Sequence, residues 1–139
     1  EGYLTGIVEN IDDTEYSSTS LTYENGDITS ISSKMNGLEN KFIYEPGEES
    51  STYHLPCLGL LEIHPLTFHI EALYAGLLGK DPRHFTMHSC PAGSNDEKTV
   101  YSYGFDKKGN PSRMICQTTY AGGQASYYPY TRNISISFE

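Results

Sequence analysis

Two Asn-Gly pairs, Asn25-Gly26 and Asn36-Gly37, constrain the fold of this chain more than any other feature of its sequence. Both central residues of a type I′ turn need a positive φ, and Asn-Gly adopts that geometry more readily than most pairs. Strand-like runs surround the two pairs and span 16–24, 27–35 and 38–44. The first third of the chain is therefore predicted to consist of consecutive antiparallel hairpins.

More strand-like runs follow in the last third of the chain. Thr99, Tyr101, Tyr103 and Phe105 alternate along one face of a predicted strand. Other strands are expected over 3–9, 111–120 and 124–138. The Glu45-Pro46-Gly47 segment is expected to end the strand before it, because proline donates no hydrogen bond to a ladder. We expect about seven or eight antiparallel strands in a single domain over 1–139.

The middle of the chain has a helical pattern instead. Apolar residues from Leu66 to Leu78 recur at helical spacing, which predicts one amphipathic helix over 66–78. Pro65 suits the first turn of this helix, and Gly79 suits the left-handed position after its last turn. A helix of this length is too short to be stable alone, so it must pack on the sheet. The segment 80–95 contains two prolines and is predicted to be an irregular loop.

Composition excludes some classes of function. The chain has 139 residues, with 18 acidic and 9 basic side chains and a net charge of -9. Nucleic acid is not an expected partner, because phosphates require a basic face. No apolar run approaches the roughly 20 residues of a membrane-spanning helix.

The negative charge is concentrated in residues 1–53, which hold 11 acidic residues against Lys34 and Lys41. We interpret this region as a solvated acidic edge that favours solubility and opposes edge pairing. The alternative is a cation site, although the spacing lacks the glycine and the distal glutamate of an EF-hand loop. Its ligands would be Asn10, Asp12, Asp13 and Glu15.

A weak repeat links three stretches of the chain. In each stretch a glycine is followed two residues later by an apolar residue or proline, and five residues later by an apolar residue. The three glycines are Gly2, Gly26 and Gly109. Such a glycine turn with its following strand cannot bury its own face, so the copies must pair side by side.

These hairpins resemble the tyrosine-rich β repeats of the YD/Rhs type. The whole chain resembles a family of Bacteroidetes exported lipoproteins, a domain of unknown function with a porin-like fold. The resemblance is carried by 2–7 with 23–31, by 73–80 and by 101–114. The segment 81–91 departs from the family pattern, because it contains histidines and a cysteine.

The resemblance implies a curved antiparallel sheet or partly open barrel, with the helix near 66–78 in its concavity. It also implies export, and a lipidated cysteine upstream that holds the protein in the periplasm or at the outer-membrane surface. It implies no known reaction. Because the chain begins inside a repeat, we expect an earlier strand or two and the export signal to precede Glu1.

His84, His88 and Cys90 are the best candidates for a metal site, because zinc accepts imidazole and thiolate at such spacing. His64 and His69 are nearby in the sequence. Two prolines bracket the segment and no further ligand matches the pattern, so we expect neither a bound metal nor another cofactor.

The chain has three cysteines, an odd number, so at least one of them has no disulfide partner within the chain. In an exported protein, a disulfide between Cys57 and Cys90 would clamp both ends of the helical segment. The alternative is three separate small buried thiols.

The chain contains 12 tyrosines, and four of them are candidates for binding a ligand. Tyr101, Tyr103, Tyr128 and Tyr130 are predicted to form an aromatic platform for a glycan or a peptide, if the C-terminal strands pair. The alternative is that the same rings pack in the core.

No nucleophile with its base and orienting group is readable, so no catalytic residue is predicted. A non-catalytic, extracytoplasmic binding module is the function that we expect. One alternative is a hydrolase whose site is assembled in space from His84, His88 and Cys90. The other is a purely structural protein of the cell envelope.

Overall fold

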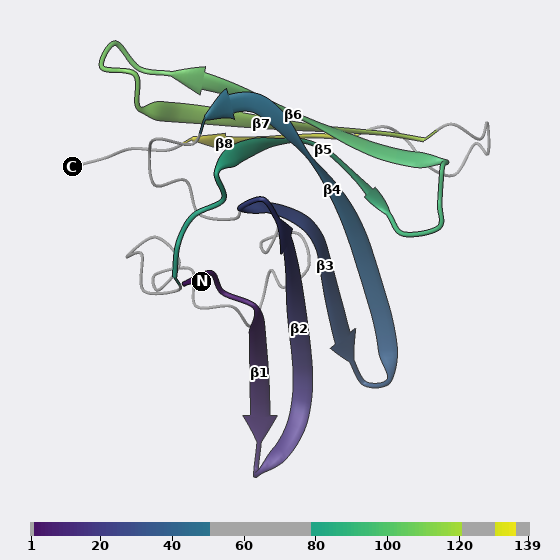
Figure 1. Cartoon of the computed structure of the whole chain (residues 1–139). Coiled ribbons are helices and arrows are strands. Elements are labelled where there is room, and N and C mark those ends of the chain that lie inside the picture. The colour runs from purple at the N-terminus through teal and green to yellow at the C-terminus, as the bar shows by residue number, and fades with distance from the viewer. Residues whose placement is uncertain (1, 51–78, 121–129, 136–139) are drawn as a thin grey trace.

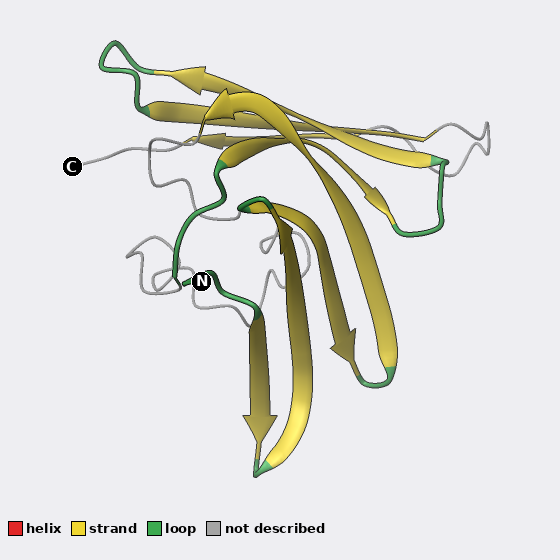
Figure 2. Ribbon diagram, viewed as in Figure 1, coloured by secondary structure: helices red, strands yellow, loops and turns green. Residues whose placement is uncertain are grey.

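The computed structural model of the protein describes residues 2–50, 79–120 and 130–135. These residues form eight β-strands and no helix, and every strand joins one antiparallel sheet whose order follows the sequence (Figures 1 and 2). The strands are β1 (Gly6–Ile11), β2 (Thr14–Glu24), β3 (Asp27–Met35), β4 (Leu38–Ser50), β5 (His84–Pro91), β6 (Glu97–Phe105), β7 (Pro111–Tyr120) and β8 (Tyr130–Ser135). The predicted mainly β fold is confirmed. The helix predicted over 66–78 lies outside the described residues.

The sheet is strongly curved. In Figure 1, β1 to β3 lie side by side in one part of the sheet, and β5 to β8 form a second part across the top of the view. The 13-residue strand β4 curves from the first part into the second. β1 and β8 stand at opposite ends of the strand order, so the sheet formed by the described residues is not closed.

The predicted hairpin turns have the expected backbone geometry. Asn25 and Gly26 have φ angles of 52° and 92°, and Asn36 and Gly37 have φ angles of 51° and 78°. φ is also positive at Gly2 and Gly109, the other two glycines of the repeat, but the strands that follow the three glycines, β1, β3 and β7, do not pair with one another as predicted. These turns fix the register of the strands that follow them.

A further turn of this kind joins β1 to β2 and was not predicted as a hairpin. Asp12 and Asp13 have φ angles of 49° and 60°. Aspartate tolerates this conformation because its short side chain can form hydrogen bonds locally. The paired carboxylates thus have a structural explanation as turn residues.

Two predictions for the middle of the chain are wrong. Residues 84–91, predicted to be part of an irregular loop, form β5, because their backbone pairs with β4 and the prolines stand outside or at the end of the strand. Pro46 does not end β4, since it pairs with Thr86 within an irregular part of the ladder. A proline is tolerated there because the ladder is already interrupted by bulges.

The buried apolar side chains form two clusters. Leu21, Ile28, Ile31 and Tyr44 make up the first, on β2 to β4. Phe85, Tyr101, Met114 and Cys116 make up the second, on β5 to β7. The register aligns Leu21 with Ile31 and Ile31 with Phe42, so these side chains share one face of the sheet.

Hydroxyl groups are also buried on the sheet. The side chains of Thr99 and Thr118 hydrogen-bond each other at 2.8 Å, and the Ser17 hydroxyl donates to the Glu9 carboxylate. Because these buried polar groups have partners, they avoid the cost of desolvation without a hydrogen bond.

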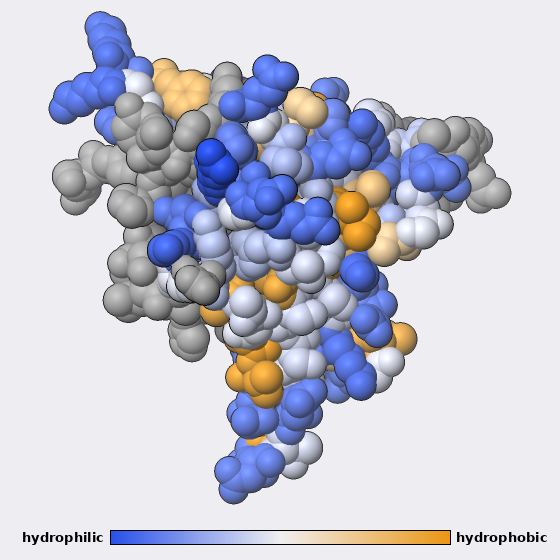
Figure 3. All heavy atoms as spheres, viewed as in Figure 1, coloured by the Kyte–Doolittle hydropathy of each residue, from blue (hydrophilic) through white to orange (hydrophobic). Residues whose placement is uncertain are grey.

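The visible surface is mostly polar, with separate apolar patches (Figure 3). The exposed large apolar residues come from five strands, and they are Val8, Ile11, Met35, Leu38, Ile43, Met87 and Phe105. No helix in the described part of the chain has the length and apolar character needed to cross a membrane.

Replacing Ile31 with alanine tests the first cluster. Ile31 is 0% exposed, so Ile31→Ala should lower the free energy of unfolding in a denaturant titration. We expect a loss of about 2–5 kcal/mol, from lost burial and the cavity that remains. Ile11 is 55% exposed and provides the matched control. Ile11→Ala should cost less than about 0.5 kcal/mol, and equal losses in the two variants would contradict the assigned core.

Candidate functional site

The ladder between β5 and β6 is the shortest in the described sheet. These strands pair only at His88↔Val100 and Ser89↔Thr99. By contrast, β6 pairs with β7 along its whole length, from Glu97 to Phe105. We call the junction of β5 and β6 the seam.

Pro91 ends the seam on the side of the β5–β6 loop. The backbone N–H of Ala92 donates to the carbonyl of Lys41 at 2.8 Å, which sets the phase of the hydrogen bonds between β4 and β5. In that phase Ser89 and Pro91 direct their backbone groups toward β6. Continued pairing would place Pro91 opposite Glu97, but proline has no N–H to donate.

A bulge in β5 ends the seam on the other side. Glu45 pairs with His88 and Pro46 pairs with Thr86, so Met87 is an extra residue on β5. Such a bulge shifts the hydrogen-bond phase of the strand by one residue. The Thr86 carbonyl faces β6, since it accepts a hydrogen bond from the Tyr103 hydroxyl at 2.8 Å.

Beyond the bulge, β5 and β6 are out of phase. β6 directs the backbone groups of Tyr101 and Tyr103 toward β5, because Thr99 faces β5 and the direction alternates. β5 instead directs the backbone groups of Thr86 toward β6. The Tyr103 side chain links the two strands at a position where no backbone pair joins them. The Thr86 N–H points the same way as its carbonyl, and no register pair joins Thr86 to β6.

A cavity of about 570 Å³ lies at this end of the seam. We call it the aromatic cavity. Its lining comes from the bulged part of β4 and from the separated parts of β5 and β6, and comprises Pro46, Gly47, Glu48, Phe85, Thr86, Met87, Tyr101, Ser102 and Tyr103. A side chain at Gly47 would have its Cβ 3.4 Å from the carbonyl oxygen of Phe85, so glycine allows β4 to lie close to β5 here.

The aromatic rings of the cavity are held by one another and by hydrogen bonds. Phe85 and Tyr103 stack with ring centroids 4.7 Å apart, and Phe105 lies against Phe85 with centroids 5.9 Å apart. The hydroxyls of Tyr101 and Ser89 hydrogen-bond at 2.8 Å. These contacts give the cavity a rigid aromatic wall.

The structure brings two of the four predicted platform tyrosines together. Tyr101 and Tyr103 both line the aromatic cavity, although Tyr101 is only 6% exposed and belongs to the second cluster. Tyr103 is half-buried. Tyr130 lies in β8, where its backbone pairs with Thr118, and Tyr128 lies outside the described residues. The platform of four rings therefore stays a prediction.

Phe85 and Met87 are site residues that the sequence reasoning missed. Met87 is 43% exposed at the cavity, whereas Phe85 is buried in its wall. Both belong to the segment predicted to be a loop. The alternation of Phe85, Met87 and Ser89 between two prolines could have indicated a short strand.

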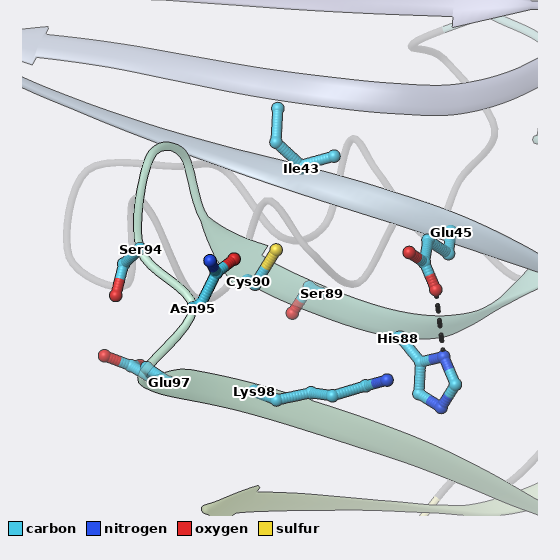
Figure 4. Close-up of a pocket in the computed structure, with 9 residues that line it drawn as sticks. All are labelled: Ile43, Glu45, His88, Ser89, Cys90, Ser94, Asn95, Glu97 and Lys98. Atoms are coloured by element: carbon cyan, nitrogen blue, oxygen red, sulfur yellow. Dashed lines mark hydrogen bonds and ion pairs between the residues drawn. The ribbon is translucent and has the colours of Figure 1, made fainter. Parts of the chain in front are cut away.

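A second pocket, of about 190 Å³, lies at the loop end of the seam and is shown in Figure 4. It is lined mainly by polar side chains, which are Glu45, His88, Ser89, Cys90, Ser94, Asn95, Glu97 and Lys98, together with Ile43. The His88 Nδ1 and the Glu45 Oε2 are 3.1 Å apart. In Figure 4 the Cys90 thiol points away from the His88 ring, so these two groups do not form a nucleophile–base pair.

The predicted metal ligands have separate partners in the structure. Asp27 accepts a hydrogen bond from the His84 backbone N–H at 2.7 Å, and its other oxygen lies 2.8 Å from the His84 Nδ1. His88 instead pairs with Glu45. Within the described ranges, no group of three or more His, Cys, Asp or Glu side chains could hold a metal ion.

Cys90 has no disulfide partner within the described residues, and Cys116 is buried in the second cluster. Cys57, which was predicted to pair with Cys90, lies outside the described residues. The Cys57–Cys90 disulfide therefore stays a prediction.

Comparisons with known proteins identify the family. The model of a domain of unknown function (DUF4595) with porin-like fold matches residues 1–113. This match covers most of the chain, and the chain belongs to that family. The expected membership in a family of unknown function with a porin-like fold is thus confirmed. No curated protein matches the chain.

A solved structure supports the same fold. The crystal structure of a porin-like protein from Bacteroides uniformis ATCC 8492 superposes with a TM-score of 0.80 at 26% sequence identity. The match covers 99% of this chain and 54% of that protein. This chain therefore spans about half the length of the porin-like protein.

Removing the Tyr103 hydroxyl tests the bridge across the seam. Tyr103→Phe keeps the ring stacked on Phe85 but removes the donor to the Thr86 carbonyl. In a denaturant titration, we expect the free energy of unfolding to fall by about 0.5–1.5 kcal/mol. The control is Tyr16→Phe, at a half-buried tyrosine of β2 whose hydroxyl has no hydrogen bond within the described part of the chain. If Tyr103→Phe is as stable as the parent and as Tyr16→Phe, the hydrogen bond from Tyr103 to Thr86 does not stabilise the sheet and the prediction is wrong.

Proposed function

We propose that this chain is a non-catalytic, extracytoplasmic module that binds a glycan or a peptide in the aromatic cavity. The observation that carries the proposal is a cavity of about 570 Å³ with an aromatic wall at an interrupted strand ladder. Ligand sites commonly enclose about 300–1,000 Å³ and are lined mainly by apolar and aromatic side chains. The exposed Met87 at this cavity offers an apolar contact to an incoming ligand.

The orientation of Cys90 argues against the hydrolase alternative. His84 and His88 each interact with a carboxylate, and the thiol of Cys90 points away from His88 (Figure 4). A hydrolase assembled from these three residues would need a nucleophile within hydrogen-bond reach of its base. This geometry favours the binding proposal over the hydrolase alternative.

We further propose that the module belongs to an exported Bacteroidetes lipoprotein with YD/Rhs-like tyrosine-rich repeats. Its place would be the periplasm or the outer-membrane surface, held by a lipidated cysteine upstream. Support comes from the sequence resemblance and from the structural match to a protein of Bacteroides uniformis. Fractionation of cells that express the natural full-length protein tests this location, and recovery in the cytoplasmic fraction would contradict it.

Arrays of glycans and of peptides, probed with the 139-residue chain, test binding at the aromatic cavity. Met87→Lys should weaken binding by about tenfold or more, because it replaces an apolar contact with a charge. Met35 has the same exposure as Met87, 43%, but lies at the end of β3 and outside the lining of the cavity. Met35→Lys is therefore the matched control and should bind as the parent does. Absence of any ligand on both arrays, or equal binding by the two variants, would contradict the proposal.

A further inference from the structure

We infer that the ligand of the aromatic cavity is an extended peptide segment with a large apolar side chain and a neighbouring lysine or arginine. This inference rests on the proposed function and narrows it from two ligand classes to one. Three features of the cavity carry it: the backbone of β5, the state of the tyrosine hydroxyls and the charge of the rim.

The first feature is the backbone of Thr86. Its carbonyl is bonded by the Tyr103 hydroxyl, and its N–H points the same way, toward the gap where the ladder with β6 has stopped. Thr86 also lines the cavity. An extended peptide can accept a hydrogen bond from such a strand N–H through its own carbonyl, as in recognition by strand addition.

The second feature is that both tyrosine hydroxyls of the cavity already have partners. The Tyr101 hydroxyl is bonded to Ser89, and the Tyr103 hydroxyl is bonded to Thr86. The surfaces that remain around them include Pro46, Phe85 and Met87, which are apolar. The polar groups left for a ligand are the hydroxyls of Thr86 and Ser102 and the Glu48 carboxylate, and the apolar surface beside them suits an apolar side chain. Methionine also adapts its shape to a bound side chain.

The third feature is the charge at the rim. Glu48 is the charged member of the lining, and it is exposed. A lysine or arginine beside the apolar side chain of the peptide would therefore meet complementary charge, and added salt would weaken this contribution.

An array of random heptapeptides and an array of glycans, each probed with the 139-residue chain, separate the outcomes. We expect peptides with an aromatic or large aliphatic residue next to lysine or arginine to bind, and glycans not to bind. In the best peptide, changing the apolar residue to serine should weaken binding about tenfold or more. Replacing each peptide carbonyl in turn by a methylene group should find one position with a loss of about tenfold, because that change removes the acceptor of the Thr86 N–H.

A charge variant adds an independent readout. Glu48→Gln should weaken binding of the best peptide about threefold at low salt, and the exposed Glu15 on β2 provides the control. Glu15→Gln should leave the affinity unchanged. Glycan binding that is lost in Met87→Lys, without peptide binding, would overturn the peptide inference and leave the proposed function standing. Absence of both kinds of binding would overturn the proposed function itself.

Discussion

The hydrogen-bond phase of β5 is the constraint on which the proposed site depends. One extra residue, Met87, puts the strand out of phase with β6, and Pro91 removes a donor at the opposite end. Between these limits, the pairs that join β5 to β6 are His88 with Val100 and Ser89 with Thr99. The strands then separate on both sides, and the described residues enclose a cavity at each end of the seam. The larger cavity thus follows from backbone geometry and not only from the side chains in its wall.

The same interruption explains why tyrosine is useful at this position. Where the backbone ladder stops, the hydroxyls of Tyr101 and Tyr103 form bonds to Ser89 and Thr86 across the seam. The Tyr103 ring meanwhile stacks on Phe85 in the wall of the aromatic cavity. A tyrosine therefore links the two strands and keeps one apolar face available, which a backbone pair could not do. Core packing and the proposed ligand binding would use different parts of neighbouring side chains here.

Much of the fold was predictable from local signals. The Asn-Gly turns, the positive φ at Gly26 and Gly109, and the bounds of β3 and β7 follow from residue types and alternation. β5 was missed because the prolines around it are loop signals, and its only local sign was the alternation from Phe85 to Ser89. Its register with β4, far away in the sequence, has no local signal. Tyr101 and Tyr103 were identified as candidates, but their cavity partners Phe85 and Met87 were hidden in the supposed loop. The site therefore depends on a long-range register that no local pattern encodes.

Amide hydrogen exchange at Thr86 and Ser89 tests the interrupted ladder most directly. The two amides lie on the same strand and both face β6, but only Ser89 has a register partner there, Thr99. Residue-resolved exchange, measured by NMR, should be about tenfold or more faster at Thr86 than at Ser89 after correction for intrinsic rates. Equal protection of the two amides would show a continuous ladder and would contradict the account of the seam and its cavity.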